Sequence, residues 1–369
     1  MKRLLSAIAL FFICAGIAHA QEIVPDKVTT VKAEVVEVLK QEKTKVPGTN
    51  TPTTNQTITA KILEGDQKGE IVTVEDDYIN LKSGEMFFLV HITNSLDGSN
   101  WYSVSEPYRL SAVYFFVALF VCCVIFFGGK QGIRGLISLI VSLFFILYIL
   151  LPGILHGYPP LLVSIGVSSL IIIIGSYVTH GFNRTTSSAV AGMIVTIVFT
   201  GLLAYAAVYY TRLSGFTNEE TVYLNMDTNG VIDFAGLLLG GIMIGLLGVL
   251  YDVSIGQAVA VEELQRAGEH LSRRTIYQRA LRIGREHIGA LVNTLAIAYV
   301  GVSLPLLLLY YTSHVDFQMM LNQEIFATEI IRIMIGSIGL VLAVPITTFI
   351  STVMLLRKKE ESLQDNGCL

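Results

Sequence analysis

Hydrophobic and polar positions divide the chain into two parts that meet near Arg109. From Gln21 to about Tyr108, apolar residues come in short runs that partly alternate with polar ones, as in strands with one buried face. Beyond Arg109 the apolar runs lengthen to about 20 residues, the length needed to cross a hydrocarbon core of ~30 Å. The pattern predicts a β domain at 21–108 and a helical membrane domain at 109–356.

Four stretches of the first part are rich in branched and aromatic residues and are separated by Gly- and Asp-containing turns. They are Val31–Leu39, Thr57–Leu63, Glu70–Glu75 and Met86–Ile92. Four or five such strands predict a small β-barrel or OB-like domain. Because a basic groove with interleaved stacking aromatics is missing, we expect no nucleic-acid binding and interpret Phe87 and Phe88 as core residues. The domain has the character of a cap or a protein-contact module.

Seven apolar runs of the second part are predicted as membrane spans. They lie near Leu110–Phe127, Gly135–Leu151, Leu161–Val178, Ser187–Tyr210, Val231–Tyr251, Ile288–Tyr311 and Ile325–Leu356. The last run is too long for one straight span. We therefore expect its start to form a tilted or surface-lying turn, while Gly336, Gly339 and Pro345 permit close packing and a kink further along.

The N-terminus predicts export of the β domain. Lys2 and Arg3 precede an apolar stretch from Leu4 to Ile17, and Ala18-His19-Ala20 is a small-x-small cleavage site, which together describe a cleavable signal peptide at 1–20. The mature chain would start at Gln21 outside the cytoplasmic membrane. An odd number of spans then places the tail 357–369 in the cytoplasm.

Charge placement supports the same orientation. The predicted inner loops hold nearly all basic residues of the membrane domain: Lys130, Arg134, Arg184, six arginines between Arg266 and Arg285, and Arg357, Lys358 and Lys359. The outer loops between spans hold only Arg212. Positive residues favour the cytoplasmic side, so we predict a bacterial cytoplasmic (inner) membrane protein.

Composition agrees with this picture and adds little beyond it. Charged residues make up 15% of the 369 residues, against roughly 25% in soluble domains. The net charge of −4 is small, so the distribution of charge is more informative than its sum. The exported segment has no cysteine, which excludes a disulfide framework or a thiolate metal site there.

Asp252 is the most unusual residue of the membrane domain. It ends the glycine-spaced fifth run, yet "VSIGQAVAV" after it stays apolar. Either the helix continues into the interface with Asp252 as a solvated end residue, or the segment breaks at 254–257 and re-enters the membrane. We favour the break, since such backbone is tolerated where it lines a wet cavity and an ionisable group there indicates a functional site. Gln257, Glu262 and Asn293 would be its polar neighbours.

A second polar pair lies near the opposite membrane surface. Glu329 and Arg332 stand at i, i+3 at the start of the last run. They are interpreted either as an interfacial ion pair or as part of a polar pathway, and the sequence leaves both open.

Residues 262–287 form the largest predicted inner loop. It contains no proline, and its helix formers and apolar anchors predict an amphipathic helix pair. Its arginines are Arg266, Arg273, Arg274, Arg279, Arg282 and Arg285. They would either contact anionic lipid of the bilayer or dock a cytoplasmic protein partner, in the manner of coupling helices of transport subunits.

Enzymatic motifs are missing from the sequence. It has no Walker A loop, no H-E-x-x-H and no G-x-S-x-G elbow, and Glu269-His270 and Glu286-His287 lack a second histidine at metal spacing. We therefore expect no catalytic residues, no metal and no cofactor. The oligomeric state has no signature in the sequence.

Four stretches resemble the YibE/F family of bacterial multi-pass membrane proteins. They are "GLLGVLYDVSIGQAVAVEEL", "GREHIGALVNTLAIAYVGVSLPLLLL", "EIIRIMIGSIGLVLAVPITT" and the β segment leading to Tyr108-Arg109. The resemblance implies a signal or anchor, an extracytoplasmic β domain and a polytopic helical region, but no activity. Many family members are similar in carrying two acids where this chain has Tyr251-Asp252, so a carboxylate pair is not expected to be required here.

Two functions fit these features. The first is a transport or permease-like component, indicated by Asp252, Gln257 and the Glu329–Arg332 pair within the bundle. The second is a non-transporting scaffold or assembly and regulatory module with the β domain and the loop 262–287 as its contact faces.

Overall fold

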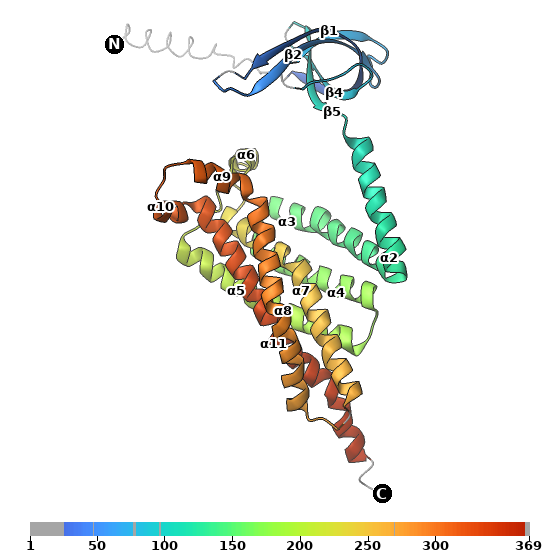
Figure 1. Cartoon of the computed structure of the whole chain (residues 1–369), viewed down its shortest axis with the longest axis vertical. Coiled ribbons are helices and arrows are strands. Elements are labelled where there is room, and N and C mark those ends of the chain that lie inside the picture. The colour runs from blue at the N-terminus through green and yellow to red at the C-terminus, as the bar shows by residue number, and fades with distance from the viewer. Residues whose placement is uncertain (1–25, 47, 77–78, 96, 269, 366–369) are drawn as a thin grey trace, which may run out of the picture. The chain divides into compact units, whose positions relative to one another are not determined.

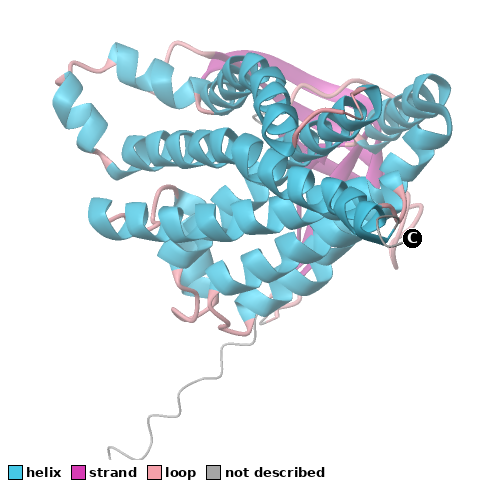
Figure 2. Cartoon of the chain, turned by 90° about the horizontal axis from the view of Figure 1, so that it is seen from below, coloured by secondary structure: helices cyan, strands magenta, loops and turns pink. Residues whose placement is uncertain are grey.

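The computed structural model describes residues 26–365 apart from 47, 77–78, 96 and 269, with side chains up to residue 356. The chain divides into two compact units, Met1–Phe120 and Val121–Leu369. The predicted signal peptide at 1–20 lies outside the described residues, as do the side chains of the predicted tail at 357–369. Every strand of the described chain belongs to the first unit, and the second is helical (Figure 2).

Five strands form one antiparallel sheet in the order β3-β2-β1-β4-β5 (Figure 1). They are β1 (Lys27–Lys45), β2 (Pro52–Ile62), β3 (Ile71–Asp76), β4 (Met86–Thr93) and β5 (Asn100–Pro107). The first four overlap the predicted strands, although β1 extends beyond its predicted range at both ends and β2 begins at Pro52 and not at Thr57. The fifth has weak alternation and little branched character, which explains why the sequence pattern did not locate it.

The sheet is curled. The first half of β1 pairs with β4 and the second half with β2, and two register shifts interrupt the β1–β2 ladder between Val35 and Lys40. Such irregularities bend and twist a strand. As a result the two edge strands, β3 and β5, approach each other.

The inner face of the curled sheet holds the core of the first unit. Ile58, Ala60 and Ile62 are buried, as their alternation predicts. Phe87 is also fully buried, whereas Phe88 is partly exposed, with its ring 5.7 Å from that of Tyr108. The prediction of Phe88 as a core residue is therefore wrong, because consecutive strand residues point to opposite faces.

The second unit is a bundle of long helices joined by short ones (Figure 1). Its elements, with α2 entering from the first unit, are α2 (Leu110–Phe145), η1 (Ile146–Leu150), α3 (Leu151–Leu155), α4 (Pro160–His180), α5 (Arg184–Thr211), α6 (Glu219–Asp227), α7 (Phe234–Ala267), α8 (Arg273–Val302), α9 (Leu304–Thr312), α10 (Phe317–Asn322) and α11 (Glu324–Asp365). Asn183, Asp233 and Ser272 cap α5, α7 and α8 by accepting backbone hydrogen bonds.

Among the described residues, five helical segments are long and apolar enough to cross a membrane, or six if α8 and α9, which meet at 64°, count as one bent span. Two of the seven predicted spans lie within one of these segments, Leu110–Leu155. Gly129 interrupts that segment with non-helical angles (φ 53°, ψ −135°), which glycine adopts without a Cβ clash. The count of seven crossings stays a prediction.

The last helix differs from expectation. α11 runs without interruption from Glu324 to Asp365 and continues through Pro345. The first turn of α11 is thus not separate from the rest of the helix, while its predicted tilt stays a prediction. Its N-terminus is instead held by the side chain of Glu324, which accepts hydrogen bonds from the Ser214 N–H (2.7 Å), the Ser214 hydroxyl (2.7 Å) and the Gly215 N–H (2.8 Å) in the α5–α6 loop.

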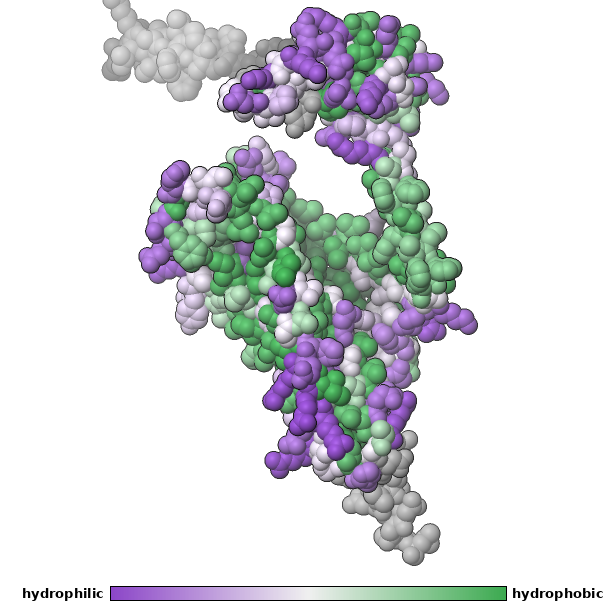
Figure 3. All heavy atoms as spheres, viewed as in Figure 1, coloured by the Kyte–Doolittle hydropathy of each residue, from purple (hydrophilic) through white to green (hydrophobic). Residues whose placement is uncertain are grey.

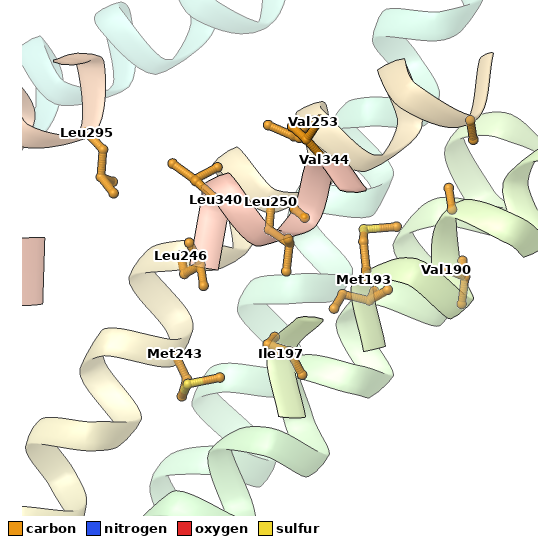
Figure 4. Packing of buried hydrophobic residues seen from close by; sticks show 14 residues of the cluster. Val190, Met193, Ile197, Met243, Leu246, Leu250, Val253, Leu295, Leu340 and Val344 are labelled. Atoms are coloured by element: carbon orange, nitrogen blue, oxygen red, sulfur yellow. The ribbon is translucent and has the colours of Figure 1, made fainter. Parts of the chain in front are cut away.

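Helices α5, α7 and α11 pack together at the centre of the bundle. Figure 4 shows their buried side chains converging, including Met193 and Ile197 of α5, Leu246 and Leu250 of α7, and Leu340 and Val344 of α11. Gly192 permits a close approach, since a Cβ there would lie 2.9 Å from the Thr347 Cα. Small residues at such crossings are typical of helices that associate in lipid.

Candidate functional site

Asp252 lies in an unbroken helix. α7 is helical from Phe234 to Ala267, so the predicted break at 254–257 is wrong and the alternative, a continuing helix, is what the chain forms. The polar residues that indicated the break find partners on another helix: the Ser254 hydroxyl accepts a hydrogen bond from Thr347 (3.2 Å) and Gln257 bonds to Thr348. These partners lie about 90 residues further along the chain, beyond the reach of a local pattern.

Asp252 nevertheless lines a cavity, as a site residue should. A pocket of about 240 Å³ lies between α7, α8 and α11. It is bordered by Asp252, Val253, Gly256, Gln257, Ile283, Gly284, His287, Leu291 and Val344. One carboxylate, one amide and one imidazole thus line an otherwise apolar pocket that is open on one side, since Asp252 and His287 are both exposed. Apolar walls with a few convergent polar groups are the usual composition of a small-molecule site.

The sequence did not single out His287 as a site residue. It was noted only for lacking a second histidine at metal-ligand spacing. The signal that could have found it is the i, i+4, i+8 series Ile283, His287 and Leu291, which lies on one face of α8 and lines the pocket. A lone imidazole between two apolar residues of one helical face is the pattern that indicates such a lining residue.

Gln257 is the best-fixed polar group of the pocket. Its side chain is 4% exposed, and its Oε1 accepts a 2.8 Å hydrogen bond from the Thr348 hydroxyl. Gly284 of α8 makes room for the amide, because a Cβ at that position would lie 2.5 Å from both Gln257 Nε2 and Val344 Cγ1. Three helices therefore position this one side chain.

A buried polar seam continues from Gln257 along the contact of α5, α7 and α11. In addition to the Thr348 and Thr347 bonds, the hydroxyls of Ser188 and Ser351 lie 2.9 Å apart, and both residues are fully buried. Hydroxyls also bond back to their own helices, as Thr348 does to the Val344 carbonyl. Interhelical bonds of this kind hold helices together where water is excluded.

Glu262 belongs to a different place. It lines a second pocket, of about 340 Å³, with His180, Asn183, Thr185, Thr186, Ile255, Val259 and Arg266. Its carboxylate accepts hydrogen bonds from the Thr185 hydroxyl and from Arg266, each at 2.5 Å. The two pockets lie on different faces of α7, so Glu262 is not a neighbour of Asp252 as the sequence predicted.

Asn293, Glu329 and Arg332 are also separate from the Asp252 pocket. Asn293 is exposed on α8, on the side turned away from the pocket-lining residues. Glu329 and Arg332 pair at 3.2 Å with about a quarter of each side chain exposed, and the Arg332 guanidinium lies 5.9 Å from the centre of the Tyr299 ring. The predicted set therefore resolves into Asp252 and Gln257 together, with the other four elsewhere.

The six arginines of 262–287 fall into two groups. Arg266 pairs with Glu262 and Glu263, and Arg273 is half-buried and donates to the Leu356 carbonyl. Arg274, Arg279, Arg282 and Arg285 are exposed on α8 and have no ion-pair partner among the described residues. The predicted helix pair is present as the end of α7 and the start of α8.

In the described part of the chain, no three His, Cys, Asp or Glu side chains lie close enough together to hold a metal ion.

Comparison with known proteins gives one match. No curated protein and no solved structure matches the chain. Residues 116–357, which include the Asp252 pocket, α8 and the whole helical bundle up to Arg357, match the family described as YibE/F-like protein. The chain therefore belongs to the YibE/F family.

Proposed function

We propose that this protein is a permease-like transport component whose solute site is the pocket between α7, α8 and α11. The observation that carries the proposal is the meeting of Asp252, Gln257 and His287 in one cavity of an apolar helical bundle. An ionisable side chain among membrane helices is costly, and such residues usually face a polar pathway.

The size and lining of the pocket indicate the class of solute. About 240 Å³ is below the usual range of ~300–1,000 Å³ for drug-sized ligands, so the solute is small. A single carboxylate together with an imidazole and an amide favours a polar solute that donates hydrogen bonds, while Val253, Leu291 and Val344 provide an apolar wall.

The membrane arrangement proposed with it has seven crossings, with the N-terminal domain outside the cytoplasmic membrane and the C-terminus inside. The asymmetric placement of basic residues and the interruption at Gly129 support it. We also propose that the β unit is an OB-like barrel, since its strand order with β3 approaching β5 is that of a five-stranded Greek-key barrel.

Access to the pocket tests the transport proposal. A permease must expose its site alternately to both sides of the membrane, whereas a scaffold has no such need. We would introduce Val344→Cys, a small change at a pocket-lining residue, in a chain whose native cysteines are serine. Labelling with a small membrane-impermeant thiol reagent would then be measured in right-side-out and inside-out vesicles.

The proposal expects Val344→Cys to be labelled from both sides. Leu246→Cys is the matched control, because Leu246 is equally buried in the same bundle but does not line the pocket. It should stay unlabelled in both preparations. Labelling of Val344→Cys from one side only, or from neither, contradicts transport through this pocket.

A non-transporting scaffold is the second candidate. It is favoured by the exposed apolar side chains of the β unit, where Trp101 is 68% and Val28 60% exposed. Isolated exposed aromatics often anchor protein contacts. Co-purification in mild detergent with the wild-type chain, and its loss with Trp101→Ser, would support this reading.

A further inference from the structure

Four arginines of α8 remain without a role in the bundle. Arg274, Arg279, Arg282 and Arg285 are exposed and have no ion-pair partner among the described residues, unlike Arg266 and the half-buried Arg273. Figure 3 shows the hydrophilic side chains gathered over the lower part of α8 and giving way to hydrophobic ones above. The outer face of α8 thus changes from hydrophilic to hydrophobic along its length.

The positions of these arginines relative to the apolar part of α8 differ. The apolar stretch begins at Ile288. At ~1.5 Å per residue, Arg285 and Arg282 lie about 4 and 9 Å before it, whereas Arg279 and Arg274 lie about 14 and 21 Å before it. The headgroup layer is about 5–7 Å thick on each side of the hydrocarbon core. Arg285 therefore lies within this layer and Arg282 just outside it, where its long side chain can extend toward the headgroups, whereas Arg279 and Arg274 lie further out.

The face above these two arginines is shaped for an acyl chain. Arg282, Arg285 and Gly289 follow at i, i+3 and i+7, so they share one side of the helix. Gly289 has open space where a side chain would stand, and Ala290 next to it is also exposed. Ile297 and Val300 extend this face with 61% and 42% of their side chains exposed. Gly289 and Ala290 leave room beside the helix, and the exposed Asn293 and then apolar residues follow them on this face.

We propose that this face of α8 binds an anionic phospholipid, with its phosphate held by Arg282 and Arg285 and an acyl chain lying over Gly289 and Ala290. Two guanidinium groups one turn apart can each donate paired hydrogen bonds to a phosphate. Glu286 is the one carboxylate on this stretch, and it has no ion pair with either arginine in the structure. The site does not depend on whether the protein carries a solute.

A lipid fits this surface better than a protein partner does. A soluble partner would meet Arg274 and Arg279 first, since these project furthest from the membrane. A second copy of this chain would bring Arg282 and Arg285 close to their own equivalents, which is unfavourable for like charges. A phospholipid is the occupant that matches both the charge at 282–285 and the small and apolar residues that follow on the same face.

Native mass spectrometry of the full chain released from detergent tests the proposal, with phosphatidylglycerol as the anionic probe and phosphatidylcholine as its zwitterionic reference. The informative comparison is between R282Q/R285Q and R274Q/R279Q, because the two double variants remove the same charge from the same helix. We expect R282Q/R285Q to weaken phosphatidylglycerol binding by about tenfold and R274Q/R279Q by less than about twofold.

A third variant tests the face over Gly289. Gly289→Leu keeps every arginine, and a Cβ at this position meets no neighbouring atom, so the variant should not lower the melting temperature. We expect it to lower phosphatidylglycerol binding by obstructing the acyl chain. Equal losses in both double variants would show diffuse attraction and overturn the site. A chain dimer that disappears with Gly289→Leu, or binding that ignores all three variants, would overturn it as well.

Discussion

The side-chain oxygen of Gln257 accepts a 2.8 Å hydrogen bond from the hydroxyl of Thr348, and both residues are buried. This bond joins the middle of α7 to the middle of α11 beside the Asp252 pocket. It fixes the amide on one side and leaves its NH₂ group directed at Gly284 on α8. The Gln257 side chain therefore both links α7 to α11 and forms part of the pocket lining.

The coupling between these two residues can be measured. Gln257→Leu and Thr348→Val each remove one partner while keeping similar volume, and interhelical hydrogen bonds in membrane bundles average ~0.6 kcal/mol, with a maximum of ~1.7 kcal/mol. We expect a double-mutant cycle on the free energy of unfolding in mixed micelles to give a coupling energy in this range. A coupling energy indistinguishable from zero would mean that the bond does not stabilise the bundle.

Gly284 should be intolerant of any side chain. A Cβ at this position would lie 2.5 Å from Gln257 Nε2 and from Val344 Cγ1, so Gly284→Ala forces packed atoms apart. Overpacking of this kind costs about 1–3 kcal/mol. Thermal unfolding monitored by the loss of helical circular dichroism would report this destabilisation.

Gly289→Ala is the matched control for Gly284→Ala. It adds the same methyl group to the same helix at a position with open space. We expect no destabilisation and a gain of about 0.4–1 kcal/mol, because alanine favours the helix over glycine. Similar destabilisation by both variants would indicate a helix-wide effect and not the contact with Gln257.

Much of the architecture follows from the sequence, but the site follows only in part. Lengths of apolar runs and strand alternation place most elements because they are local signals. Asp252 and Gln257 belong to one pocket as expected, since both lie on α7 and are five residues apart. Glu262 is five residues further, where the helix has turned it to another face.

The missed features depend on contacts between distant segments. The break predicted after Asp252 is wrong because Thr347 and Thr348 satisfy the polar residues of α7, and no pattern near 254–257 reveals them. Asn293 is an exposed residue because the rotation of α8 is set by Ile276, Ala280 and Gly284 packing inward. His287 enters the pocket for the same reason. Tertiary packing, and not propensity, decides these cases.

The contact between Glu324 and Ser214 should stabilise the N-terminal end of α11. One carboxylate oxygen accepts three hydrogen bonds from the α5–α6 loop, and Glu324→Ala would leave those donors to water. Hydrogen bonds to a charged group contribute more than neutral ones, but this contact is partly exposed, so we expect a loss of about 1–2 kcal/mol. Limited proteolysis of the α5–α6 loop should accelerate in the variant.

Glu220→Ala serves as the control for Glu324→Ala. Glu220 is exposed in α6, a short helix just after the same loop, and has no ion-pair partner among the described residues. Its removal should leave both the melting temperature and the proteolysis rate close to those of the wild type. If Glu220→Ala accelerates cleavage as much as Glu324→Ala does, the hydrogen bonds to Ser214 and Gly215 are not the cause.

Asp252 should be required for activity but not for folding. The residue has no hydrogen bond or ion pair that the described structure relies on, so Asp252→Asn keeps shape and removes only the charge. We expect the variant to reach wild-type abundance and to fail in complementation of a deletion strain. Glu263→Gln, an exposed change on the same helix, should complement fully. Full complementation by Asp252→Asn would show that the pocket carboxylate is dispensable.

The orientation of the helical bundle can be decided by thiol labelling at two loops. The two loops contain Asn218 and Ser272, which cap α6 and α8 and should not be replaced. We would therefore place the cysteines nearby, at the exposed Glu220 and His270. Cys122 and Cys123 are exposed on α2 and should first be changed to serine. With the β unit exported and seven crossings, Glu220→Cys should react with an impermeant maleimide in intact cells, and His270→Cys only after permeabilisation. The arginines that follow His270 favour the cytoplasmic side, which makes this a strong expectation of the charge rule. Labelling of His270→Cys in intact cells would contradict both the orientation and the seven crossings.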